Sequence, residues 1–271
     1  MRQRASNTAV EMPFLDHLEE LRWRIFYSAI SIAVGTVVGF VVVHYLGIME
    51  ILIRPVRPLL EGGELAYFSP ATPFFITLKL ALVVGIVLAF PVVIYQIWAF
   101  LAPGLSEDER KVIVPSLYFG LVLFCAGVAM AYFFVLPLAL VFLTGFQQEF
   151  LVATIEVGEY LGFVTKLLLA FGAAFELPVV IMILSAMGLV TPKFLREKRR
   201  HAIVLFTVLA SLLTPGDIAS TFLMIVPLIL LYEGSIFLSV AIYRRRWSAQ
   251  EGEGLRASEE PPPGAVEMEG R

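Results

Sequence analysis

The sequence predicts an all-α, polytopic integral membrane protein with six transmembrane helices. Of its 271 residues, 59% are hydrophobic and 16% are charged, against roughly 45–50% and about 25% in soluble domains. The charged side chains gather in short segments, and the apolar stretches between them are long enough to cross a hydrocarbon layer of roughly 30 Å. This distribution excludes a soluble domain and a disordered chain, and the single cysteine, Cys125, excludes an intramolecular disulfide.

Apolar segments at about residues 25–46, 74–100, 112–136, 160–187, 202–213 and 222–243 are the predicted spans. The fifth of these extends only about 18 Å at 1.5 Å per residue, so it is either re-entrant or crosses a locally thinned bilayer. The turn sequence Thr214-Pro215-Gly216-Asp217 favours the thinned crossing, because it starts the sixth segment from the opposite face. The fifth and sixth spans are therefore expected to be short.

Three regions follow from this pattern. Residues 1–24 form a cytoplasmic segment with an amphipathic helix, residues 25–246 form the six-helix membrane domain, and residues 247–271 form an acidic cytoplasmic tail. From about Ser248 onward the tail carries six Glu residues and Pro261-Pro262-Pro263, a composition that predicts disorder. The charges of both signs in residues 1–24 do not match a cleaved signal peptide.

Basic residues near the span ends predict the orientation. One set of loops holds fourteen of the 20 Lys and Arg residues, whereas the opposite set holds only Arg54 and Arg57. Both termini are therefore expected in the cytoplasm, in a multi-pass protein of the plasma or inner membrane. The fourteen are Arg2, Arg4, Arg22, Arg24, Arg110, Lys111, Lys193, Arg196, Lys198, Arg199, Arg200, Arg244, Arg245 and Arg246.

Four charged residues lie inside the predicted spans, namely Lys79, Lys166, Glu176 and Glu233. Each costs about 2.5–3.5 kcal/mol to insert, so each is a functional candidate. The two lysines are close enough to the outer span ends to snorkel. Glu176 lies near the middle of its span, and Pro178 removes a backbone donor beside it, so a polar notch is expected.

That notch has several possible roles. It could hydrogen-bond a peptide or a partner helix, or it could bind a proton or a cation. The structural alternative is a protonated Glu176 that merely ties two helices together. The same structural alternative applies to Glu233.

Two cytoplasmic segments carry acids. Phe14, Leu18 and Leu21 have helical spacing and predict an interfacial amphipathic helix, with Asp16 and Glu20 on its polar side. Between the second and third spans, the acids Glu107-Asp108-Glu109 follow Ser106. Paired carboxylates suit a guanidinium ligand. Equally, Ser106 could be an N-cap with acids in the first turn of the next helix.

No pattern indicates an enzyme, a cofactor or a metal site. The three histidines, His17, His44 and His201, are dispersed, and no Cys, Asp or Glu cluster has metal-ligand spacing. Phosphate-loop, dinucleotide and nucleophile-elbow motifs are absent from the sequence. The net charge of -3 argues against a nucleic-acid partner.

Four motifs stand in order along the chain, and they are His17-Leu18-Glu19-Glu20-Leu21-Arg22, Tyr95-Gln96-Ile97-Trp98-Ala99-Phe100-Leu101-Ala102-Pro103, Phe175-Glu176-Leu177-Pro178 and Leu212-Leu213-Thr214-Pro215-Gly216-Asp217. Together with six spans and both ends inside, they resemble the motifs of TatC, the core subunit of the twin-arginine protein translocase. The resemblance covers roughly residues 12–246 and depends on the order and spacing of the motifs.

The resemblance implies a receptor for signal peptides with paired arginines. Such a receptor supports export of folded proteins driven by the proton-motive force, together with single-span TatA- and TatB-type subunits and further copies of itself in the lipid membrane. Glu20 and Glu109 are then the acids that face the two arginines, and the extra acids Glu107 and Asp108 depart from the common family pattern. The remaining positions implied for the signal-peptide site are His17, Arg22 and Phe100.

Further positions match the family away from that site. Glu176 matches the mid-membrane acid on the concave face of the family fold, while Pro55, in the first outer loop, and Asp217 match positions needed for activity. The alternative function is a proton- or cation-coupled small-solute transporter that uses Glu176. The lack of matching sequence halves counts against it. An intramembrane protease would need a nucleophile and a base, and no credible pair is found.

Overall fold

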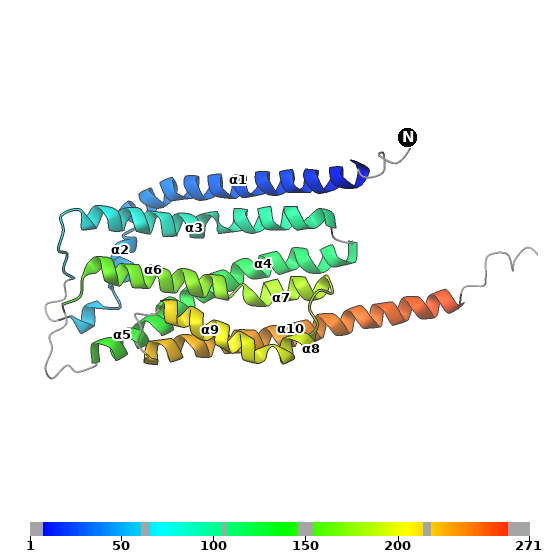
Figure 1. Cartoon of the computed structure of the whole chain (residues 1–271). Helices are drawn as coiled ribbons and strands as arrows, with labels where there is room; N and C mark the ends of the chain where they lie inside the picture. Colours follow the sequence, from blue (N-terminus) through cyan, green and yellow to red (C-terminus); the bar gives the residue numbers. More distant parts are fainter. Residues whose placement is uncertain (1–7, 61–64, 105–106, 146–153, 214–217, 260–271) are drawn as a thin grey trace, which may run out of the picture.

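The computed structural model describes residues 8–60, 65–104, 107–145, 154–213 and 218–259. Within these ranges the regular elements are helices, with one isolated bridge between Ala66 and Glu156. In chain order they are α1 (Thr8–Tyr45), α2 (Ile48–Ile53), η1 (Arg57–Leu59), α3 (Thr72–Leu101), η2 (Ala102–Gly104), α4 (Glu107–Met130), η3 (Ala131–Val135), α5 (Leu136–Gly145), α6 (Val157–Ala174), α7 (Leu177–Ala186), α8 (Pro192–Glu197), α9 (Arg199–Leu213) and α10 (Ile218–Glu259). The predicted all-helical class is confirmed (Figure 1).

Five helical segments of the described part are long and apolar enough to cross a membrane. They match predicted spans one to four and six. The predicted fifth span falls in α9, whose 15 residues extend about 22 Å at 1.5 Å per residue. The shallow crossing there stays a prediction. The five segments are Leu15–Tyr45, Thr72–Leu101, Ile113–Gly145, Val157–Ala186 and Thr221–Ala241.

The first helix joins the predicted amphipathic segment to the first predicted span. The amphipathic helix is not a separate element, because α1 runs without a break from Thr8 to Tyr45. Between Leu21 and Ile25 the chain contains neither proline nor glycine, so nothing ends the helix where the surface segment meets the span. The acids of the N-terminal segment are therefore carried on a direct extension of the first span.

The last helix also extends further than the composition indicates. α10 continues to Glu259, into the segment expected to be disordered from about Ser248. Ala, Gln, Glu, Leu and Arg dominate Ser248–Glu259 and are good helix formers, which lets the helix continue beyond its apolar part. Residues 260–271 lie outside the described part.

Small residues allow α1 to lie directly against α3. A Cβ atom at Gly85 of α3 would lie 2.5 Å from the backbone nitrogen of Thr36, and one at Gly35 would lie 2.6 Å from the carbonyl oxygen of Gly85. A Cβ at Gly39 would meet the carbonyl oxygen of Ala81. Close backbone approach at small residues is how transmembrane helices gain packing energy without a hydrophobic driving force. Figure 1 shows α1 at the edge of the bundle with α3 beside it.

The fourth span is broken at its middle. α6 ends at Ala174 and α7 begins at Leu177, with Pro178 in the first turn of the second helix. Since Pro178 has no backbone N–H and its ring crowds the preceding turn, the helix is interrupted here. The fully buried side chains Leu161, Leu167 and Phe171 of α6 hold this span in the core. The break leaves Glu176 between two half-helices.

Candidate functional site

Three of the predicted site residues meet where α1 and α3 lie side by side. The imidazole ring of His17 stacks on the ring of Phe100, with centroids 4.4 Å apart and an interplanar angle of 11°. Nδ1 of His17 lies 3.9 Å from Oε2 of Glu20. The Glu20 side chain is 31% exposed, so its carboxylate remains open to a ligand. His17, Glu20 and Phe100 therefore form one surface cluster.

Two residues that the sequence analysis missed complete this cluster. Nη2 of Arg24 donates a hydrogen bond of 3.0 Å to Oε1 of Glu20, and Nη1 donates one of 3.1 Å to Oε1 of Gln96. The signal in the sequence was the i, i+4 spacing of Glu20 and Arg24, the favourable order for an ion pair on a helix. We call His17, Glu20, Arg24, Gln96 and Phe100 the Glu20 cluster.

Glu109 lies in the first turn of α4, which begins at Glu107. The side chains of Glu107, Asp108 and Glu109, and the whole of Ser106, lie outside the described part. The neighbouring Arg110 donates hydrogen bonds from Nε and Nη2 to the carbonyl oxygen of Ala102, at 3.3 and 2.7 Å. These bonds tie the start of α4 to the end of α3, so the chain carries Glu109 back toward the helix end that holds Phe100.

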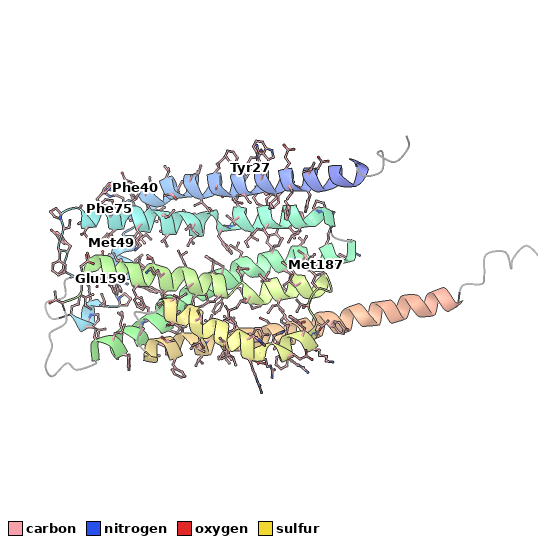
Figure 2. All side chains as sticks on the ribbon, viewed as in Figure 1. Tyr27, Phe40, Met49, Phe75, Glu159 and Met187 are labelled. Carbon is pink, nitrogen blue, oxygen red and sulfur yellow. The ribbon has the colours of Figure 1, made fainter. Side chains whose placement is uncertain are left out.

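Arg22 does not join the Glu20 cluster. Two residues along an α-helix turn the side chain by about 200°, and the Arg22 guanidinium lies 5.6 Å from the centroid of the Trp23 ring. With Trp23, Ile25, Phe26 and Ala29, Arg22 lines a shallow surface hollow of about 400 Å³. Figure 2 shows Tyr27, which stacks with Trp23, on the side of α1 that faces away from α3. The structure therefore separates Arg22 from the other predicted residues of this site.

Glu176 occupies the break between α6 and α7, and its side chain faces α4. A Cβ atom at Gly120 would lie 2.7 Å from Oε2 of Glu176, so the carboxyl group fills the space that a side chain at position 120 would take. Oε1 is buried and has no hydrogen-bond partner among the described residues. Within the described part, no hydrogen bond from this carboxyl ties two helices together, which leaves the predicted polar notch with an unused acceptor.

Glu233 is held differently from Glu176. Nη2 of Arg199, at the start of α9, lies 2.7 Å from Oε2 of Glu233 in α10. The two side chains are 47% and 36% exposed. The pair links two helices, as the structural alternative for Glu233 proposed, but with an arginine as the partner.

This pair carries a test of stability. We expect Arg199→Gln and Glu233→Gln each to lower the thermal stability of the purified protein, and the double variant to lose less than the sum. The expected coupling free energy is about 0.5–1 kcal/mol, because both side chains are partly exposed. Thermal unfolding of the four proteins in one detergent measures it. Strictly additive losses would show that the pair contributes nothing.

Pro55 lies at the end of the bundle opposite to the Glu20 cluster, between α2 and η1. Two tyrosine hydroxyls hold the preceding turn, since Tyr132 donates to the carbonyl oxygen of Ile51 at 2.6 Å and Tyr160 donates to that of Leu52 at 2.7 Å. The next residue, Val56, is fully buried. Pro55 is therefore part of a fixed outer turn. Asp217 lies outside the described residues.

The fold and these clusters define a helical membrane protein with no described group of metal ligands, with acids at one bundle end and an acid, Glu176, at the middle of a span. The family model for the Sec-independent protein translocase protein TatC matches residues 16–227. The chain belongs to the TatC family. Its members are components of a protein translocase and not enzymes, and nothing in the comparisons supports the small-solute transporter.

The sequences of individual TatC proteins are similar to this one along nearly the whole chain. The Sec-independent protein translocase protein TatC of Aquifex aeolicus is 40% identical over 242 residues, which are 89% of this chain and 100% of the relative. TatC of Escherichia coli K12 is 38% identical and covers 84% of this chain and 88% of the relative. A crystal structure of the twin arginine translocase receptor TatC superposes with a TM-score of 0.75 at 40% identity, over 83% of this chain and 99% of that one.

Proposed function

We propose that this chain is the receptor subunit that binds paired-arginine signal peptides of folded cargo and supports their export driven by the proton-motive force. The observation that supports the proposal most directly is the Glu20 cluster. It offers a partly buried carboxylate beside a stacked imidazole and phenyl pair. A guanidinium can hydrogen-bond the carboxylate and lie against the aromatic face at the same time.

The second arginine of the signal peptide is proposed to bind Glu109. The Arg110 bonds to Ala102 support this, because they draw the first turn of α4 toward the end of α3. Glu107 and Asp108 add negative charge to the same turn. Arg22 is proposed to act from the far side of α1, beside Trp23, and not in direct contact with the bound arginines.

Within the membrane, Glu176 is the proposed contact for the apolar part of the peptide or for a partner helix. Oε1 of Glu176 lacks a hydrogen-bond partner within the described part of the chain. A polar group on an approaching helix can stabilise it by donating a hydrogen bond, since hydrocarbon offers no competing donor. The partners are proposed to be single-span TatA- and TatB-type subunits and further copies of this chain. Pro55, Asp217 and Glu233 are proposed to support the assembled translocase.

The orientation is proposed from the two ends of the bundle. α1 begins and α10 ends at the same end of the bundle (Figure 1). The α3–α4 and α7–α8 connections lie at that end too, next to Arg110 and Lys111 in the first turns of α4 and Lys193 at the start of α8 (Figure 1). The other end carries Arg54 and Arg57 near α2. Because Lys and Arg favour the cytoplasmic side, we assign both termini to the cytoplasm and the protein to the inner membrane.

A photocrosslinking scan tests the proposed site. A photoreactive residue at Leu21 or Leu101, next to the Glu20 cluster, is expected to label a paired-arginine signal peptide in membrane vesicles that hold the whole translocase. The same residue at Val37 is the control, because Val37 is 69% exposed and lies about 200° around α1 from Gly35, which faces α3. Equal labelling from all three positions, or equal labelling of a paired-lysine peptide, would contradict the proposal.

A further inference from the structure

Glu20 already carries a guanidinium from its own chain. Arg24 donates to Oε1 of Glu20 through Nη2, and the only described contact on the other side of the carboxylate is His17 Nδ1, 3.9 Å from Oε2. Arg24 thus binds Glu20 as a peptide arginine would, but it bonds only one of the two carboxylate oxygens. A guanidinium binds a carboxylate best when its two parallel N–H groups reach both oxygens.

We propose that Arg24 is an internal competitor for the arginines of the signal peptide. A peptide guanidinium can take both oxygens of Glu20 only after Arg24 has left Oε1. Arg24 thereby sets the minimum affinity that a signal peptide needs. The inference rests on the proposed function, because it requires Glu20 to be an arginine site.

The geometry makes this exchange possible at low cost. Nη1 of Arg24 remains bonded to Oε1 of Gln96 on α3 while Nη2 is displaced, so the guanidinium keeps one hydrogen-bond partner. The Arg24 side chain is 29% exposed, which allows its released N–H groups to reach water. Gln96 therefore serves as the resting contact of Arg24, and Glu20 as the contact that is exchanged.

The competition also favours arginine over lysine. An ammonium group is a point charge that cannot present two parallel N–H groups to the two carboxylate oxygens. A lysine ammonium is therefore expected to bind Glu20 more weakly than the Arg24 guanidinium that it must displace. Two guanidiniums on one carboxylate would repel each other, so a ligand cannot simply bind beside Arg24 without weakening that contact.

The test is a binding measurement on the full-length protein in lipid nanodiscs, with fluorescent paired-arginine and paired-lysine signal peptides. Arg24→Gln is expected to tighten binding of the paired-arginine peptide about fivefold, the gain from removing one partly exposed charge-assisted contact. Binding of the paired-lysine peptide should also become measurable. Gln96→Ala removes the hydrogen-bond partner that Arg24 keeps after its release from Glu20, so it is expected to make the exchange costlier and to weaken binding of the paired-arginine peptide by a small factor.

Arg200→Gln is the matched control. It removes the same charge from the start of α9, on the other side of the bundle from α1 (Figure 1), and should leave both affinities unchanged. In a Glu20→Gln background, Arg24→Gln should have no effect, because there is no carboxylate left to compete for. Thermal unfolding of each variant verifies that it is folded.

The outcomes separate this inference from the proposed function. If Glu20→Gln binds the paired-arginine peptide as tightly as the unaltered protein, Glu20 is not the arginine site and both proposals fail. If Glu20→Gln weakens binding but folded Arg24→Gln leaves it unchanged, only the competitor is overturned. Weaker binding by folded Arg24→Gln also overturns it, since Arg24 would then orient Glu20 for the peptide.

Discussion

Glu20→Lys is expected to abolish binding of paired-arginine signal peptides, with a loss of at least about 100-fold. Truncating one member of a desolvated charge pair costs about 2–5 kcal/mol, and reversing the charge adds repulsion. In this protein the new ammonium would face Arg24 at the position where Oε1 of Glu20 accepts its hydrogen bond. The peptide arginine would meet two positive charges instead of a carboxylate. Peptide binding to the purified protein and export of a folded reporter in cells measure the loss.

Glu19→Lys is the matched control for this change. It makes the same charge reversal one residue earlier on α1, at an exposed side chain that takes no part in the Glu20 cluster. We expect it to retain most of the binding. Glu20→Gln should lie between the two, because it removes the charge but keeps an oxygen acceptor. Unchanged binding by Glu20→Lys would remove Glu20 from the proposed site.

Gly85→Val is expected to have the largest effect on the fold. A Cβ at this position would lie 2.5 Å from the backbone nitrogen and 2.6 Å from the Cα atom of Thr36. Since these are backbone atoms of a helix, neither can move aside alone, and α1 as a whole must move away from α3. Overpacking of this kind costs about 1–3 kcal/mol or more. Thermal unfolding and protease resistance of the detergent-solubilised protein measure the loss.

The same substitution should remove peptide binding. Glu20 and Arg24 lie on α1, whereas Phe100 and Gln96 lie on α3, so the Glu20 cluster exists only while the two helices are in contact. Gly234→Val is the matched control, because nothing lies within 4 Å of a Cβ at Gly234 in α10. It should leave stability unchanged or slightly higher, since valine favours helix more than glycine does. A stable, binding-competent Gly85→Val would show that α1 and α3 tolerate separation.

Particular residues show which features the sequence indicated and which it did not. A polar notch at Glu176 was expected from Pro178, because a proline inside an apolar span removes a backbone donor. The break between α6 and α7 was not predicted, since Pro91, Pro115 and Pro227 lie inside unbroken helices. The amphipathic segment is helical and continues directly into the first span, and the sequence did not indicate this continuity, since apolar spacing describes a face of a helix and not where the helix ends. The resemblance to the family grouped Arg22 with Glu20, but the turn of α1 places the two side chains on different sides.

The sequence by itself determined what depends on local composition. The apolar spans, the helical class and the rarity of acids such as Glu176 within the spans follow from the energetic cost of placing charge and open backbone in hydrocarbon. The tertiary structure decided which residues meet. Gln96 is 72 residues from Arg24, and no pattern in the sequence shows that it shares the guanidinium that holds Glu20. That contact depends on glycines that let α1 lie against α3, which is a matter of packing between distant segments and not of local propensity.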